Sequence, residues 1–136
     1  MVVGLILITS VTEARPLYHR WLLHAIDLYA ATAMDAYELG GTVQLNQYLS
    51  TIETDSHVNA VLLKENVNVS SKPIPPDLAS LLERSRKDKQ SHFAFGTPWR
   101  GVVLQTHRGK AYTFAAEVRP FETYGRFQEQ IGRAHV

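Results

Sequence analysis

The chain of 136 residues contains no cysteine, which removes several possibilities at once. Without thiols it has no disulfide framework, no thiolate metal site and no cysteine nucleophile. Its charges nearly cancel, leaving a net charge of +1 at pH 7. This balance gives no electrostatic reason to expect nucleic acid as a partner, and we find no repeated basic motif. With 45% hydrophobic and 20% charged residues, the composition is typical of one small globular domain with its own core.

The apolar run over residues 1–11 is too short to cross a bilayer. As a helix at about 1.5 Å per residue it would cover roughly 16 Å, about half of the hydrocarbon core. The polar residues Thr12 and Glu13 follow it, which is typical of the point where a helix leaves a membrane. We therefore interpret residues 1–12 as the end of a truncated transmembrane helix. A signal peptide and a buried element of a soluble domain are the alternatives, although no basic residue precedes the run.

The other end of the chain also suggests a fragment. Residues 131–136 resemble the translation of a common sequencing-library adapter, a scar that we exclude from fold reasoning, with a frayed native tail as the alternative. Residues 121–130 are polar enough for a linker. The folded domain is thus expected within residues 13–120.

Residues 17–39 predict one long helix, because no Pro or Gly interrupts them and Leu, Ala, Met and Glu dominate. Gly40 and Gly41 end it, and a second helix is expected over residues 43–54. The long helix has more apolar surface than one core-facing stripe needs, which predicts packing on two sides and hence a dimer. The residues that we assign to a dimer and transmission face are Leu17, Trp21, His24 and Leu28.

The rest of the sequence predicts strands around a third helix. Residues 58–63 and 67–70 read as a hairpin, and Pro75-Pro76 begin a helix whose leucines Leu78, Leu81 and Leu82 face the sheet. Residues 92–95, 99–106 and 111–118 read as a three-stranded meander with one buried face. The expected fold is therefore α+β, with an antiparallel sheet of about five strands.

One cluster of the meander combines cationic donors with aromatic rings, a combination suited to an anionic ligand. Strand pairing would bring several of its members together, although exposed edge and turn residues have the same composition without any ligand. The candidate ligand-binding residues are His92, Trp99, Arg100, His107 and Tyr112.

We assign no catalytic, cofactor-binding or metal-ligating residue. His24 and Asp27 are three apart on the long helix but have no third ligand nearby. Ser70 and Ser71 are not in a nucleophile elbow, and no Gly-rich nucleotide loop is present.

Helix, helix, strand, strand, helix and three strands follow one another directly after an apolar segment. This order resembles the extracytoplasmic sensor region of bacterial membrane-bound sensor histidine kinases. The phrases that carry the resemblance are residues 15–18, 28–30, 47–49, 58–63 and 70–78, and it covers about residues 1–120. One departure is the first hairpin, where relatives tend to carry Asp-x-x-Gly and this chain has Lys64-Glu65-Asn66-Val67.

The resemblance implies a PAS-like sensor domain at residues 13–120, with a long N-terminal helix continuous with the truncated transmembrane helix. The domain would lie in the periplasm of a bacterium, held at the inner membrane by residues 1–12, with the linker over residues 121–130 leading to a second membrane helix. A homodimer would relay the binding of a small molecule or periplasmic protein by helix displacement. The full-length parent would be an ATP-dependent protein histidine kinase, and this fragment would not be an enzyme. Alternatives are the sensor region of a chemoreceptor or membrane cyclase, or a membrane-anchored interaction domain without signalling.

Overall fold

The computed structural model describes residues 15–96 and 98–119, with side chains from Arg20 onward. The segments interpreted above as a membrane helix end (1–12), a linker (121–130) and an adapter scar (131–136) lie outside the described residues. The elements are the helices α2 (Arg15–Ser56) and α3 (Pro76–Asp88) and five strands. The strands are β1 (Val58–Lys64), β2 (Val67–Asn68), β3 (His92–Ala94), β4 (Trp99–His107) and β5 (Lys110–Val118). The predicted α+β class and the number of strands are confirmed.

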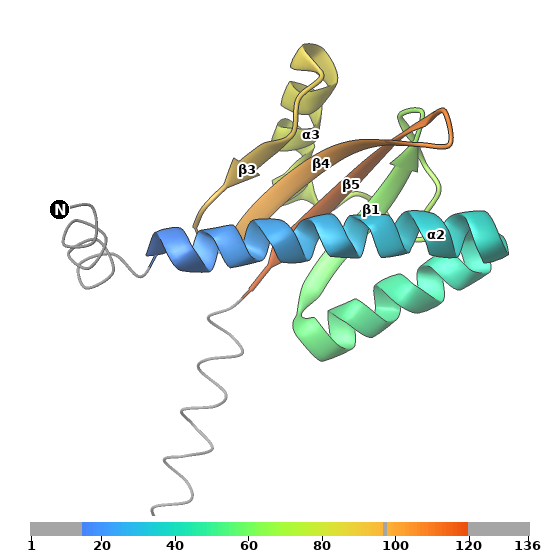
Figure 1. Cartoon of the computed structure of the whole chain (residues 1–136), viewed down its shortest axis with the longest axis horizontal. Helices are drawn as coiled ribbons and strands as arrows, with labels where there is room; N and C mark the ends of the chain where they lie inside the picture. Colours follow the sequence, from blue (N-terminus) through green and yellow to red (C-terminus); the bar gives the residue numbers. More distant parts are fainter. Residues whose placement is uncertain (1–14, 97, 120–136) are drawn as a thin grey trace, which may run out of the picture.

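Helix α2 consists of two helical arms joined at a sharp corner (Figure 1). The corner is Gly41, whose backbone angles of φ 69° and ψ −158° are open to glycine and strained for other residues. The second arm then runs back beside the first, as Figure 1 shows. The predicted break at Gly40-Gly41 is therefore confirmed.

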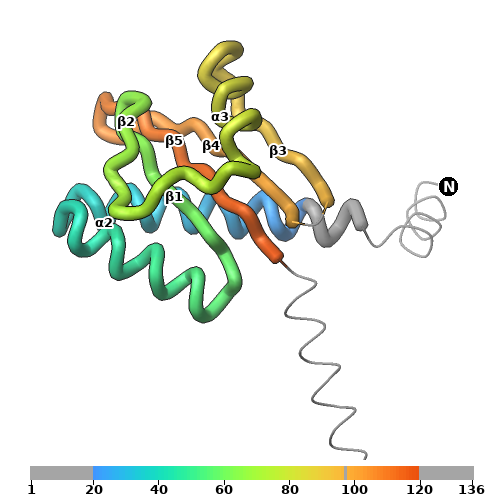
Figure 2. Tube along the Cα trace, turned by 180° about the vertical axis from the view of Figure 1, so that it is seen from behind, coloured from blue at the N-terminus to red at the C-terminus, as the bar shows by residue number. Residues whose placement is uncertain are grey.

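The five strands form one antiparallel sheet in the order β2-β1-β5-β4-β3. The last strand lies in the middle, where β5 pairs along its length with both β1 and β4. Figure 2 shows from behind that α2 lies on one side of this sheet and α3 on the other. The strand that leads toward the C-terminus is thus held between the two layers of helix.

Both faces of the sheet are covered, which corrects the prediction of one buried face. On the α2 face, Phe114 and Tyr112 of β5 pack with Ile26 and Leu49 in the larger core. On the other face, Ala115 lies with Leu78 and Leu81 of α3 in a second, smaller core. Alternation along β5 shows that its two faces differ but not what covers each one.

The hairpin between β1 and β2 forms without glycine. Lys64 pairs with Val67, so the turn consists of Glu65 and Asn66, both at positive φ (50° and 66°). Two residues with positive φ give the tight turn that matches strand twist, and asparagine tolerates this conformation better than most residues. The departure from the Asp-x-x-Gly pattern therefore leaves the hairpin intact.

Within residues 15–96 and 98–119, no helix combines the length and apolar character that crossing a membrane requires.

Candidate ligand-binding groove

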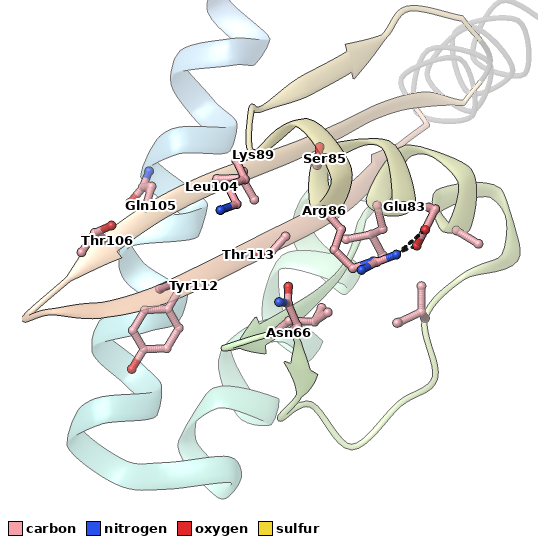
Figure 3. A pocket seen from close by; sticks show the side chains of 15 residues that line it. Asn66, Glu83, Ser85, Arg86, Lys89, Leu104, Gln105, Thr106, Tyr112 and Thr113 are labelled. Carbon is pink, nitrogen blue, oxygen red and sulfur yellow. Dashed lines mark hydrogen bonds and ion pairs between the residues drawn. The ribbon is translucent and has the colours of Figure 1, made fainter.

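A groove of about 840 Å³ lies between α3 and the end of the sheet at which β4 turns into β5 (Figure 3). One wall comes from α3, the floor from β1, β4 and β5, and one end from the β1–β2 turn. Its lining includes Leu63, Asn66, Ile74, Ala79, Leu82, Glu83, Ser85, Arg86, Lys89, Leu104, Gln105, Thr106, Ala111, Tyr112 and Thr113. The volume is in the range that holds a small organic molecule.

Apolar side chains and isolated hydroxyls from the wall and the floor meet in the groove. Leu63, Leu82 and Leu104 belong to the smaller core or pack against it. The Ser85 hydroxyl is buried and has no hydrogen-bond partner among the described residues. Thr113 adds a second hydroxyl at the edge of the floor, with 9% of its surface exposed. An apolar floor with isolated hydroxyls suits the body of a ligand that also carries a polar group.

Charged side chains stand at the α3 rim. Arg86 donates two hydrogen bonds to Glu83, Nε to Oε2 at 3.0 Å and Nη2 to Oε1 at 2.6 Å. The hydrogen bond from Arg86 holds the pKa of Glu83 below its usual value. Lys89 follows the helix in the left-handed conformation, with its amide donating to the Ser85 carbonyl. Cations at a helix C-terminus also oppose the negative end of the helix dipole.

Two of the five candidate ligand residues, His107 and Tyr112, contact the same residue, Glu38, on the far side of the sheet from the groove. His107 Nε2 lies 3.2 Å from Glu38 Oε1 and 3.4 Å from Asp35 Oδ1, so the end of β4 is tied to α2. Burial raises the pKa of Tyr112, and the negative charge of nearby Glu38 raises it further. The Tyr112 ring points toward α2 in Figure 3, so this residue borders the groove without presenting its hydroxyl to it.

The other three candidates are separated from that pair. His92 pairs with Asp88 at the end of α3, with 2.6 Å between Nε2 and Oδ2. Trp99 is 2% exposed in the core under α2, where its ring packs on Phe93 with centroids 5.8 Å apart. Arg100, the next residue, points to the opposite face, because successive side chains of a strand alternate. Of the five, the structure therefore brings His107 and Tyr112 together at Glu38 and holds the other three apart from them.

The sequence reasoning missed the groove residues. Ser85, Gln105 and Thr113 carry no motif, and their meeting depends on where α3 crosses the sheet. The available signal was the register of β5 opposite Tyr112 and Phe114, in which Thr113 and Ala115 are small enough for a helix to lie close over them.

The outer face of α2 carries large apolar side chains in contact with solvent. Trp21 is 62% exposed and Leu28 is 71% exposed, with His24 exposed between them. These three predicted dimer residues are three and four positions apart and share one face of the helix. The side chain of the fourth, Leu17, lies outside the described residues.

Among the described residues, no group of three or more His, Cys, Asp or Glu side chains is arranged to hold a metal ion. No protein-family model matches the chain, and no curated protein and no solved structure is similar to it.

Proposed function

We propose that the chain is the extracytoplasmic input domain of a bacterial membrane-bound sensor histidine kinase. It binds a small molecule in the groove under α3 and passes the signal on by a displacement of helices in a homodimer. The domain is PAS-like, α2 continues the membrane helix that ends in residues 1–12, and the folded part lies in the periplasm.

The observation that supports this proposal most is the position of the groove. It opens on one face of the sheet, whereas α2 covers the other face of the same strands. Thr113 lines the groove, and its neighbours Tyr112 and Phe114 pack into the α2 core. A ligand that moved β5 by a fraction of an ångström would therefore press on α2, because packed cores shift between discrete arrangements.

The lining favours an amphipathic ligand with an acidic group. Leu63 and Leu104 offer an apolar surface, and the Ser85 hydroxyl can donate one hydrogen bond. Arg86 and Lys89 at the rim would attract a negative charge. Because Glu83 already pairs with Arg86, the carboxylate of a ligand would have to share or displace this contact.

The exposed face of α2 supports the homodimer. Trp21 and Leu28 together expose more apolar surface than an isolated helix face needs, and Arg20 and Asp27 flank them. In a receptor tethered to one membrane the two copies would meet in the same orientation, each helix presenting this face to the other. The same face favours the second candidate, a membrane-anchored interaction domain whose helix pairs permanently. If the part of the gene that follows this region encodes a phosphoacceptor histidine, a chemoreceptor or a membrane cyclase is excluded as the parent protein.

The groove is tested with hexanoate, which combines a carboxylate with a short apolar chain. Hexanoate is expected to shift the amide NMR signals of Leu104, Gln105 and Thr113, and hexanol at equal concentration to shift them less. Leu104→Trp fills the floor and should remove the shifts, whereas Gln47→Trp, on an exposed position of α2, should keep them. Shifts confined to other surfaces, or equal shifts in both variants, would contradict the groove as a binding site.

The signalling role needs the complete gene. In membrane vesicles that contain the full-length protein, autophosphorylation should change when hexanoate is added on the extracytoplasmic side, and Leu104→Trp should abolish the change. A gene that encodes no kinase domain after this region would rule out the sensor kinase.

A further inference from the structure

A row of polar side chains crosses the middle of the sheet under the start of α3. Asn59 of β1, Glu117 of β5 and Arg100 of β4 are direct partners in the strand register. They share a face with the residues two positions away on each strand, which belong to the core under α3. Those residues are Val61, Ala115 and Val102.

Glu117 carries a buried carboxylate of which only one oxygen accepts a hydrogen bond. It is 4% exposed, and its Oε1 accepts a hydrogen bond of 3.1 Å from Asn59 Nδ2. The Nη2 atom of Arg119 lies 3.6 Å from the same oxygen. The other oxygen, Oε2, is buried and has no hydrogen-bond partner among the described residues.

The guanidinium group of Arg100 is also only partly hydrogen-bonded. Its Nη1 donates a hydrogen bond of 3.1 Å to the carbonyl oxygen of Asp77, in the first turn of α3. Its Nε is buried without a hydrogen-bond partner among the described residues. Arg100 thereby fixes the start of α3 to β4 while leaving a buried donor unsatisfied.

The two unsatisfied groups are complementary, since one is a cationic donor and the other an anionic acceptor. They belong to residues that face each other across one strand pair. An unpaired buried polar group is costly, and a charged one more so, so an Arg100–Glu117 bond would relieve both. The cost of forming it would be the hydrogen bond to Asp77. The two arrangements therefore exchange the contact with Asp77 for a contact with Glu117.

We propose that Arg100 is a two-position switch between the start of α3 and Glu117. In the position that the structure shows, it holds Asp77 and leaves Glu117 to Asn59 and Arg119. In the second position it binds Glu117 Oε2, frees the first turn of α3, and weakens the Glu117–Arg119 pair by placing a competing cation on the carboxylate. The role of this switch in signalling rests on the proposed sensing function, but the exchange itself does not.

The neighbours of the row favour movement of Arg100 over movement of Asn59. Asn59 Oδ1 accepts a hydrogen bond of 2.7 Å from Lys72 Nζ, and Lys72 also lies 3.4 Å from Glu53 Oε2 at the end of α2. Asn59 is therefore fixed on both sides and keeps Glu117 Oε1 in place. Oε2 is left for a partner from β4.

This switch would connect the groove to the end of the described chain. Residues of α3 from Ala79 to Arg86 contribute to the lining of the groove, and Asp77 lies in the first turn of the same helix. A ligand that draws α3 onto the sheet would shift the Asp77 carbonyl and bias Arg100 toward one position. By linkage, the position of Arg100 would change ligand affinity by the same factor.

The switch is tested in the ligand-free full chain by NMR relaxation dispersion, which detects exchange on the microsecond to millisecond timescale. We expect exchange with one common rate at Arg100 Nε and at the Asp77 carbonyl carbon. Glu117→Gln keeps the shape and removes the charge of the second partner, so it should abolish the exchange at both atoms. Lys87→Gln, which removes an exposed charge elsewhere on α3 outside the groove, should preserve it.

A double-mutant cycle in the equilibrium unfolding constant gives a second readout, independent of the exchange measurement. Arg100→Met and Glu117→Gln should change the unfolding constant non-multiplicatively, by about fivefold, because they interact in one of the two positions. Absence of exchange at Arg100 Nε, or exchange that persists in Glu117→Gln, would overturn the switch. If exchange is present but hexanoate does not bind, the switch stands and the proposed ligand function fails.

Discussion

Tyr37 of α2 and Tyr112 of β5 meet edge to face, with ring centroids 6.5 Å apart and ring planes at 74°. The Nζ atom of Lys64, from the neighbouring strand β1, lies 5.6 Å from the centroid of the Tyr37 ring. The two central strands thus contact one residue of α2 near its corner. This contact stands on the opposite side of the sheet from the groove, which makes Tyr112 a reporter of the packing between helix and sheet.

The first prediction concerns the titration of Tyr112. Its pKa is raised above 10.0 by burial and then by the negative charge of Glu38. Because the folded pKa exceeds the unfolded one, Tyr112 contributes stability that is fully present below about pH 10 and is lost as the pH rises through the folded pKa. Glu38→Gln should bring the pKa of Tyr112 down, as measured from the tyrosinate absorbance that Tyr112→Phe removes.

Glu65→Gln is the matched control for that titration. The negative charge of Glu65 makes the smallest of the contributions that raise the pKa of Tyr112, and its side chain is exposed in the β1–β2 turn. Its substitution should lower this pKa less than Glu38→Gln does. Equal effects of the two variants would show that Tyr112 senses the overall charge of this end of the protein and not its contact with Glu38.

The second prediction concerns the close packing of Gly101. A Cβ at this position would lie 2.9 Å from Phe93 Cδ1 and 3.1 Å from the buried ring of Trp99. Aromatic rings in a core have little room to move, so Gly101→Ala should destabilise the fold by about 1–3 kcal/mol. Gly96→Ala, where the nearest neighbour would be 4.0 Å away, should change stability by less than about 0.5 kcal/mol. Urea unfolding of both variants gives the comparison.

The sequence predicted the features of this fold that depend on neighbouring residues. The corner of α2 follows from two consecutive glycines, and the β1–β2 hairpin from a short polar turn between apolar runs. The sequence also predicted that successive side chains of β5 alternate between two different faces, because Tyr112 and Phe114 are large and Thr113 and Ala115 are small. The prediction that the leucines of α3 face the sheet is confirmed. The place where α3 crosses the strands could not be predicted, since it depends on residues distant in sequence.

The candidate residues divide between the two faces of the sheet for a reason that the sequence did contain. Trp99 and Arg100 are consecutive in one strand, so their side chains must point to opposite faces. His107 lies at the other end of the nine-residue strand from Trp99. Composition alone had grouped these residues. The groove residues, by contrast, become neighbours only through the packing of α3, and no local pattern marks Ser85 or Gln105.

The third prediction concerns the corner of α2. Gly41 has φ 69° and ψ −158°, and any side chain there would be strained whatever the space around it. Gly41→Ala should cost about 1–3 kcal/mol in the free energy of unfolding. Gly40→Ala is no neutral control, because its Cβ would lie 2.5 Å from Gln44 Cβ, an atom that side-chain rotation does not move. Gly96→Ala, where the nearest neighbour would be 4.0 Å away, is the matched control and should change stability by less than about 0.5 kcal/mol. A Gly41→Ala variant as stable as Gly96→Ala would contradict backbone strain at the corner.

The fourth prediction concerns self-association through the outer face of α2. Leu28 is 71% exposed beside His24, at the centre of the proposed dimer face. Leu28→Asp places a charge where two apolar surfaces would meet, so sedimentation equilibrium of the full chain should show at least tenfold weaker dimerisation, corresponding to about 1.4 kcal/mol. Val67→Asp, at a 64% exposed position on the edge strand β2, should leave dimerisation unchanged. A wild-type chain that stays monomeric at all accessible concentrations, or equal weakening by both variants, would exclude this face of α2 as the dimer interface.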